Sequence, residues 1–214
     1  DFLQNPMAYN TVTYAADMNG SLENCGCRSR LMGGLVWRAG YFGELAKRTE
    51  GKVPVLKVDA GHALSDAPGA EYLSKETFAR DDFMLRAFAS LGLDVANVSY
   101  YDIPYLSQRM HVGDYAKNAA ALPALDSFVS ANVAPSDAGL RPFKPYVVRE
   151  VKGERTGGAT LRVGFLGLTE IPATAEGPGR DLVWSYRIQD PIAAAKRVVP
   201  ELRKKCDLLV VLAY

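Results

Sequence analysis

The 214-residue sequence predicts an α/β protein, because strand-like and helix-like patterns alternate along its first half. Such alternation is typical of a parallel sheet with helices on its faces. The first expected strand ends in a carboxylate, Asp17, and opens into a glycine-rich loop that runs to Leu35. Ligands of α/β proteins usually bind at the carboxyl ends of the strands. We therefore expect the functional site to lie around residues 17–35.

Each element is predicted from a local pattern. β-branched and aromatic residues at 11–16 favour a strand. Apolar residues at helical spacing predict a helix over 35–49, which Gly51 would end as a C-cap. A glycine-containing connection between 146–151 and 161–168 indicates a hairpin. The other expected elements are strands at 53–58, 94–99, 128–133 and 208–213, helices at 70–91, 113–122 and 190–205, and a surface loop at 171–179.

The C-terminal part of the chain carries two specific signals. Asp190 followed by Pro191 is typical of an N-cap with proline at the first helical position. Basic residues near Lys205 would lie in the last turn of that helix, where the helix dipole favours cations. The strand at 208–213 is fully apolar, as expected for a buried parallel strand. Because such a strand rarely ends a domain, we expect the natural polypeptide to continue beyond Tyr214.

The composition argues against several classes of partner. The formal net charge is +1 and no run is rich in Lys or Arg, which disfavours nucleic acid and anionic membranes. No apolar run approaches the roughly 18 residues that a membrane-spanning helix needs. Three cysteines are too few for a disulfide framework. Residues 1–10 are predicted to be a tail, and residues 11–214 one domain that is truncated at its C-terminal side.

The start of the chain bears on location. The sequence begins at Asp1 without a methionine, and nothing before Thr11 has the pattern of a signal peptide. A removed leader and a shortened polypeptide both explain this start. The Cys-x-Cys pair at Cys25 and Cys27 is compatible with an oxidising envelope compartment. We therefore expect a periplasmic or extracytoplasmic location, after removal of a leader that is not present in this chain.

A series of segments, in a fixed order, carries a family resemblance: TVTYAADMNGSLENCGC…MGGLVWRAG, VPVLKVDAGHAL, LGLDVANVSYYD, SFVSANV, RPFKPYVVREVKG, LRVGFLGLTE and CDLLVVLAY. Together they resemble the calcineurin-like metallophosphoesterases, in particular the 5′-nucleotidase/UDP-sugar hydrolase branch. A sub-branch with Cys-x-Cys, or its selenocysteine variant, followed by Gly-Gly-Leu-x-x-Arg is most similar. The resemblance implies a four-layer α/β/β/α sandwich, with two mixed sheets flanked by helices. It also implies phosphate-ester hydrolysis by two metal ions held at the strand ends.

The metal-ligand motifs of that family are degenerate in this sequence. The first motif, Asp-x-His, is Asp-Met-Asn at residues 17–19, and the second, Gly-Asp, is Gly-His at residues 61–62. The third, Gly-Asn-His-Glu, falls on residues 99–102, which contain neither the Asn nor the His. The fourth supplies a histidine after the last strand, where this chain has Tyr214. The fifth, Gly-His-x-His, would lie beyond the end of this chain.

These losses predict that two-metal hydrolysis has been lost. The missing second-motif aspartate would bridge the two cations, and a neutral His62 could bind one metal without offsetting the charge of two. We expect a binding or structural subunit of an envelope assembly with protein partners. The alternative is a phosphoesterase or nucleotidase with an altered ligand set of Asp17, Asn19, His62 and groups beyond Tyr214. It would act on a phosphate ester or nucleotide and use a divalent transition metal (Mn, Zn or Fe).

Cys25 and Cys27 allow three interpretations. They could form a redox-active disulfide, because a bridge across one residue is geometrically tight. They could ligate a soft metal with a partner such as His62. They could also be free thiols, or a static disulfide, that pin the loop. The first interpretation defines a further functional hypothesis, a thiol redox protein, which requires a perturbed thiol pKa and an accessible site.

Several other residues can be explained by a structural role instead of a functional one. Asp17 could cap the glycine-rich loop by accepting backbone N–H bonds instead of holding a metal. Asp102 is expected to face solvent in its loop, His111 to lie at the surface, and Cys206 to be a buried apolar filler. If the ancestral pocket is retained, the candidates to line it are Asp59, Tyr101, Asp102 and Tyr214.

Overall fold

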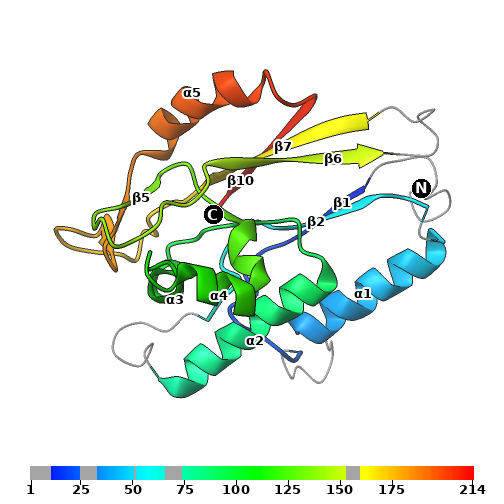
Figure 1. The fold of residues 1–214 in the computed structure, drawn as a ribbon, viewed down its shortest axis with the longest axis horizontal. Coiled ribbons are helices and arrows are strands. Elements are labelled where there is room, and N and C mark those ends of the chain that lie inside the picture. The colour runs from blue at the N-terminus through cyan, green and yellow to red at the C-terminus, as the bar shows by residue number, and fades with distance from the viewer. Residues whose placement is uncertain (1–10, 25–32, 51, 66–73, 153–159) are drawn as a thin grey trace.

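The computed structural model describes residues 11–24, 33–50, 52–65, 74–152 and 160–214 (Figure 1). Its elements follow one another in the order β1 (Thr11–Ala15), α1 (Gly34–Arg48), β2 (Val55–Asp59), α2 (Lys75–Leu91), β3 (Val95–Asn97), α3 (Ile103–Arg109), α4 (Tyr115–Ala121), the 3-10 helix η3 (Pro123–Ser127), β4 (Phe128–Val129), β5 (Val133–Pro135), β6 (Tyr146–Lys152), β7 (Thr160–Leu168), β8 (Leu182–Val183), β9 (Tyr186–Ile188), α5 (Pro191–Leu202) and β10 (Leu208–Ala213).

The strands form three sheets. A four-stranded sheet has the order β1-β2-β3-β4, and each neighbouring pair in it is parallel. A three-stranded sheet has the order β10-β7-β6, in which β10 is parallel and β6 antiparallel to β7. The short strands β5, β9 and β8 form a third, antiparallel sheet. The predicted α/β class is confirmed, although within the described residues only the second sheet is mixed; the four layers stay a prediction.

Three apolar clusters hold these elements together. One lies between the two larger sheets and joins Val58, Val95 and Val129 to Phe165 and Leu212. The largest packs the other face of the first sheet against α2, α3 and α4. The third packs α5 against the second sheet. Figure 1 accordingly shows α5 beyond β6 and β7, with α1 and α2 on the opposite side of the molecule.

Several predicted elements differ from the observed ones. In place of the single strand expected at 128–133 there are two strands, β4 at 128–129 and β5 at 133–135, in different sheets. They part because the Asn132 amide donates to the carbonyls of Thr169 and Gln189, which fixes a turn between them. Helix α3 was not predicted, and α5 ends at Leu202, so that Lys205 lies beyond its last turn.

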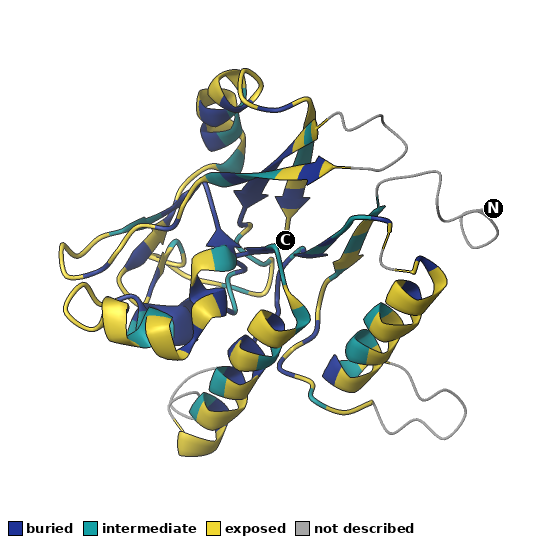
Figure 2. Cartoon of the chain, turned by 45° about the vertical axis from the view of Figure 1, so that its right-hand side comes forward, coloured by how far each residue is buried: buried dark blue, intermediate teal, exposed yellow. Residues whose placement is uncertain are grey.

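The ends of two further elements also require correction. Strand β10 was expected to be buried, but it lies at the edge of its sheet and leaves Leu208 and Val211 about half exposed. Helix α1 ends at Arg48 and is capped by Thr49, whose backbone N–H donates to the Leu45 carbonyl; Gly51, the expected cap, lies outside the described residues. Figure 2 shows that α1 also exposes much of its surface. Across the part of the chain that the structure describes, no helix has the length and apolar character to span a membrane.

Candidate functional site

Three side chains from strand ends meet in one hydrogen-bonded cluster. Asp17 follows β1, His62 follows β2 and Tyr214 follows β10. His62 Nδ1 lies 2.7 Å from Asp17 Oδ1 and 2.9 Å from the Tyr214 hydroxyl, and that hydroxyl donates to Asp17 Oδ1 over 3.0 Å. Tyr214 approaches closely because Gly61 has no side chain; a Cβ there would lie 2.5 Å from the Tyr214 Cβ. Three of the sequence-predicted positions are therefore brought together.

The backbone around this cluster is held in an uncommon conformation. Asp17, Asn19 and His62 have φ angles of 58°, 45° and 57°, in the left-handed region that non-glycine residues rarely adopt. The two loops fix each other, because the Asp17 N–H donates to Gly61 and the Asn19 N–H donates to His62. Such strain persists where surrounding contacts over-determine it, and it is concentrated at functional sites.

His62 is set deep in the cluster, whereas Asp17 faces outward. The whole His62 residue is 5% exposed, while the Asp17 side chain is 68% exposed. The imidazole stacks on Tyr101, with 4.5 Å between the ring centroids, which places this predicted residue in the cluster. When Nδ1 carries the proton and donates to Asp17, the buried Nε2 is left with a lone pair and no partner. Burial and the hydrogen bond to Asp17 raise the pKa of Tyr214, so that its hydroxyl stays a donor.

Asp59 does not line an open pocket, contrary to expectation. It is fully buried, and its Oδ2 accepts from Arg38 Nη1 at 2.6 Å. Burial raises the pKa of Asp59 to about 6, although the Arg38 guanidinium acts in the opposite direction. The same guanidinium donates to Met18 Sδ and to the Val58 carbonyl. Asp59 therefore anchors Arg38 of α1 to the end of β2.

The expectation that Asp102 faces solvent was also wrong. This carboxylate is fully buried and accepts from the N–H groups of Leu64 and Ser99, each at 2.9 Å, and from the Ser99 hydroxyl at 2.6 Å. Burial is the main cause that raises its pKa. Asp102 joins the loop after β2 to the loop after β3, so it supports the site rather than lining it.

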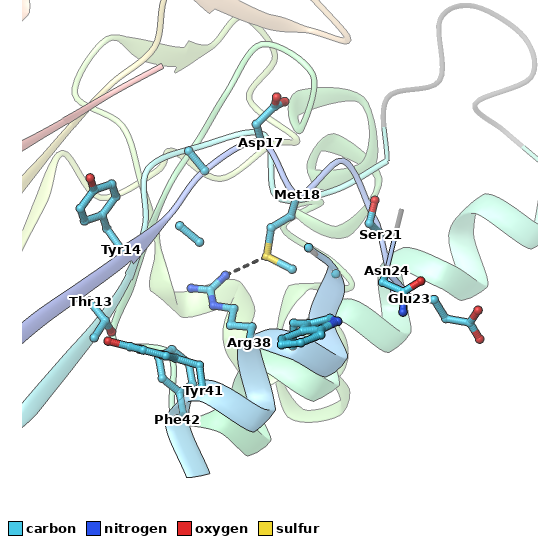
Figure 3. Close-up of a pocket in the computed structure, with 15 residues that line it drawn as sticks. Thr13, Tyr14, Asp17, Met18, Ser21, Glu23, Asn24, Arg38, Tyr41 and Phe42 are labelled. Carbon is cyan, nitrogen blue, oxygen red and sulfur yellow. Dashed lines mark hydrogen bonds between the residues drawn. The ribbon is translucent and has the colours of Figure 1, made fainter. Parts of the chain in front are cut away.

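A cavity of about 480 Å³ extends from Asp17 between β1 and α1 (Figure 3). Residues 13–18 line it from β1 and the loop that follows, and Trp37, Arg38, Tyr41 and Phe42 line it from the helix. Figure 3 shows Arg38 reaching across this space toward Met18. The helix residues were not predicted as site residues. Their signal in the sequence is the Gly-Gly-Leu-x-x-Arg run, which places Arg38 one turn into α1.

The remaining predicted residues lie elsewhere. Cys25 and Cys27 fall in segment 25–32, outside the described residues, so their interpretations stay predictions. His111 is exposed, as predicted. Cys206 is buried beside Gly164, at whose position a Cβ would come within 2.8 Å of the Cys206 sulfur, which confirms its role as an apolar filler.

The described residues that meet at the ends of β1, β2 and β10 do not fit a two-metal centre. Two-metal hydrolysis needs several hard ligands and a carboxylate shared between the ions. Among the described residues, no group of three or more His, Cys, Asp or Glu side chains could hold a metal ion. At the strand ends, Asp17 and His62 offer one carboxylate and one imidazole, and the nearby Asp59 is already paired with Arg38.

Comparisons with known proteins identify the fold. No family model and no curated protein matches the sequence. The calcineurin-like phosphoesterase YfkN of Bacillus subtilis superposes with a TM-score of 0.61 at 18% identity, over 96% of this chain and 61% of its own. The NAD nucleotidase NadN of Haemophilus influenzae gives 0.63 at 16% identity, over 96% and 34%. The 5′-nucleotidase of Candida albicans gives 0.61 at 12%, over 96% and 36%.

These likenesses show that the chain has the fold of calcineurin-like phosphoesterases and 5′-nucleotidases, as the resemblance implied. The chain spans between 34% and 61% of the length of these three structures. At such low identities, the likeness extends to the fold alone.

Proposed function

We propose that this domain is a phosphoesterase fold that has lost two-metal hydrolysis and acts as a binding or structural subunit of an envelope assembly. The observation that carries the proposal is the state of His62. It replaces the bridging aspartate that the family resemblance implies, and its Nδ1 is already held by Asp17 and Tyr214. An imidazole in this position cannot supply the shared negative charge that keeps two divalent cations close together.

The surrounding residues support the same conclusion. Asp59 cannot move into the bridging role without leaving Arg38 unpaired in a buried place, which is costly. The Asp102 carboxylate likewise already accepts hydrogen bonds from backbone N–H groups. The strained loops that would hold metal ligands instead hold a cluster of hydrogen bonds between Asp17, His62 and Tyr214. Such preorganised loops suit the binding of a partner or a small ligand.

The envelope location and the protein partners are part of the proposal. They are supported by the Cys-x-Cys pair, which is compatible with an oxidising compartment, and by the near-neutral charge of the chain. Purification of the tagged full-length protein from its native envelope fraction should yield a stoichiometric partner protein. Recovery of a lone monomer from that fraction would count against the assembly.

Turnover tests the loss of hydrolysis. The full-length protein, purified without chelator, should not hydrolyse p-nitrophenyl phosphate or AMP in the presence of Mn²⁺ above the level of its Asp17→Asn variant. Enzymes with functional metal sites typically turn over at about 1 to 10³ per second. Metal-dependent turnover that Asp17→Asn abolishes would support the altered ligand set of Asp17, Asn19 and His62 instead.

A further inference from the structure

We propose that Arg141 and Lys144 form a docking point for a single carboxylate group of a partner protein. Both residues lie in the segment between β5 and β6, where they line a small cavity of about 30 Å³ together with residues of α4 and η3. The inference deepens the proposed function and rests on it, because the partner protein of the envelope assembly would supply the carboxylate. Every residue of this lining belongs to the described stretch 74–152, so its charge is fully known.

Arg141 is held in place without the use of its guanidinium donors. Its backbone N–H donates to the Met110 carbonyl at 2.9 Å, and its own carbonyl accepts from the Tyr186 hydroxyl at 2.6 Å. Its guanidinium carbon lies over the Tyr115 ring, 3.7 Å from the ring centre. No side chain or carbonyl of the described residues accepts a hydrogen bond from this guanidinium. All five of its N–H donors are therefore available to a ligand.

The ring beneath the guanidinium is itself fixed. Tyr115 is 8% exposed, and its hydroxyl donates to Asp126 Oδ1 at 2.6 Å. The apolar residues around it in the lining are the buried Met110, Leu125, Phe128 and Phe143. A guanidinium that rests on a fixed ring presents its N–H groups in one plane, which matches the two oxygens of a carboxylate. Because this arrangement exists before binding, little conformational entropy is lost when an anion binds.

The charges of the lining favour a group with one negative charge. Arg141 and Lys144 are the two cations of this fully described lining, and Asp126 is its one carboxylate. Lys144 Nζ lies 3.7 Å from Asp126 Oδ1, and both side chains are more than half exposed, so this pair is weak. The lining thus carries one net positive charge, which a carboxylate would neutralise and a phosphate dianion would exceed.

The size of the cavity agrees with this assignment. A water molecule needs about 10 to 15 Å³ of such a cavity. The volume of about 30 Å³ therefore admits the two oxygens of a carboxylate and leaves the rest of the ligand outside. This suits a side chain that projects from a protein surface better than it suits an enclosed small molecule.

The methyl group of Met110 makes binding observable, because Met110 lines the cavity whereas Met84 is fully buried outside this lining. The full-length protein, isotope-labelled at its methionine methyl groups, is titrated with the acetylated tripeptide amide Gly-Asp-Gly and followed by NMR. The Met110 resonance, assigned with Met110→Leu, should shift saturably, and the Met84 resonance, assigned with Met84→Leu, should not. The peptide Gly-Asn-Gly should cause no shift, and a phosphoserine peptide should bind no more tightly than Gly-Asp-Gly.

Matched variants locate the binding. Arg141→Gln should weaken binding of Gly-Asp-Gly by about tenfold or more, the range expected for hydrogen bonds to a charged group. Asp126→Asn should strengthen it by about two- to fivefold, because this change removes a like charge but keeps an acceptor for the Tyr115 hydroxyl. Arg86→Gln, at an exposed arginine of α2 outside this lining, should leave binding unchanged. Circular dichroism verifies that each variant is folded.

Three results would overturn the proposal: no saturable shift of Met110, equal binding of Gly-Asn-Gly, or binding that Arg141→Gln does not alter. Tighter binding of the phosphoserine peptide would overturn it as well and would indicate a phosphate-carrying ligand. The inference and the proposed function can fail separately. A lone monomer from the envelope fraction would refute the assembly while Arg141-dependent peptide binding still held, and absent peptide binding would refute the docking point while a partner protein was still recovered.

Discussion

Arg38 and Asp59 form the ion pair that fastens α1 to the end of β2. Removing one partner of a buried pair leaves an uncompensated charge, so Arg38→Met should lower the free energy of unfolding by about 3 kcal/mol at pH 7. The loss should shrink at pH 5, where Asp59, with its pKa raised to about 6, takes up a proton. Urea unfolding at the two pH values measures both effects. In the double variant Arg38→Met/Asp59→Leu, most of the stability should return; an equal loss in both variants would contradict the account.

Asp81 provides a second test at the residue scale. It is buried and accepts from the N–H and hydroxyl of Ser65, and burial raises its pKa to about 6. The folded state therefore binds a proton at Asp81 at a pH where the unfolded chain does not, and the contribution of Asp81 to stability rises as the pH falls from 7 to 4. Between pH 7 and pH 4, the free energy of unfolding of the wild type should increase, relative to that of Asp81→Asn, by on the order of 2 kcal/mol. A difference between the two proteins that is independent of pH would refute this assignment.

Single-residue roles were the least predictable part of the site. Motif positions indicated that residues at strand ends would gather, and Asp17, His62 and Tyr214 do so. Motif positions could not show that Arg38 reaches Asp59 from a helix, or that backbone N–H groups donate hydrogen bonds to the Asp102 carboxylate. Burial and partner choice are set by contacts between distant segments, which a local pattern does not encode.

At the scale of elements, the start of α5 depends on its N-cap. The Asp190 carboxylate accepts from the Ala193 N–H at 2.6 Å, as the Asp-Pro signal predicts. Asp190→Ala should lower the free energy of unfolding by about 1 kcal/mol. Asp114→Ala is the matched control, since Asp114 stands before α4 without a capping bond from its side chain. Thermal or urea unfolding compares them, and equal losses would show that capping is not the cause.

Elements with strong local patterns were predicted correctly, and those defined by tertiary contacts were not. The periodicity of α1 and α2 and the β-branched runs of β1, β6 and β7 are local properties of the sequence. The break between β4 and β5 arises instead from the amide of Asn132, which binds carbonyls 37 and 57 residues away. No pattern in residues 128–133 reports on those partners.

At the scale of the whole molecule, the two larger sheets approach each other closely at Gly167. A Cβ at this position would clash with the Val129 carbonyl and lie 2.7 Å from Asn97 Oδ1. Gly167→Ala should therefore destabilise the protein by about 1 to 3 kcal/mol. Gly40 lies on the open surface of α1, where an added Cβ would meet no other part of the chain within 4 Å, so Gly40→Ala should stabilise the protein by about 0.5 to 1 kcal/mol. Calorimetry distinguishes the two, and a neutral Gly167→Ala would contradict the described sheet packing.

The site itself is a property of the whole chain, because it joins Asp17 to Tyr214 across 197 positions. The family resemblance, rather than any local pattern, predicted that these two ends of the sequence would meet. It could not predict the cavity beside them, whose lining combines an edge strand with the exposed rings of α1.

Metal content is the most direct test of the central claim that two-metal chemistry has been lost. It should be measured by mass spectrometry on the full-length protein, purified without chelator. We predict less than one equivalent of transition metal or zinc per protein molecule bound at Asp17 and His62. One equivalent that disappears in Cys25→Ser/Cys27→Ser, but not in Asp17→Asn, would be compatible with this claim and would indicate a thiolate site. Two equivalents, diminished by Asp17→Asn, would contradict it.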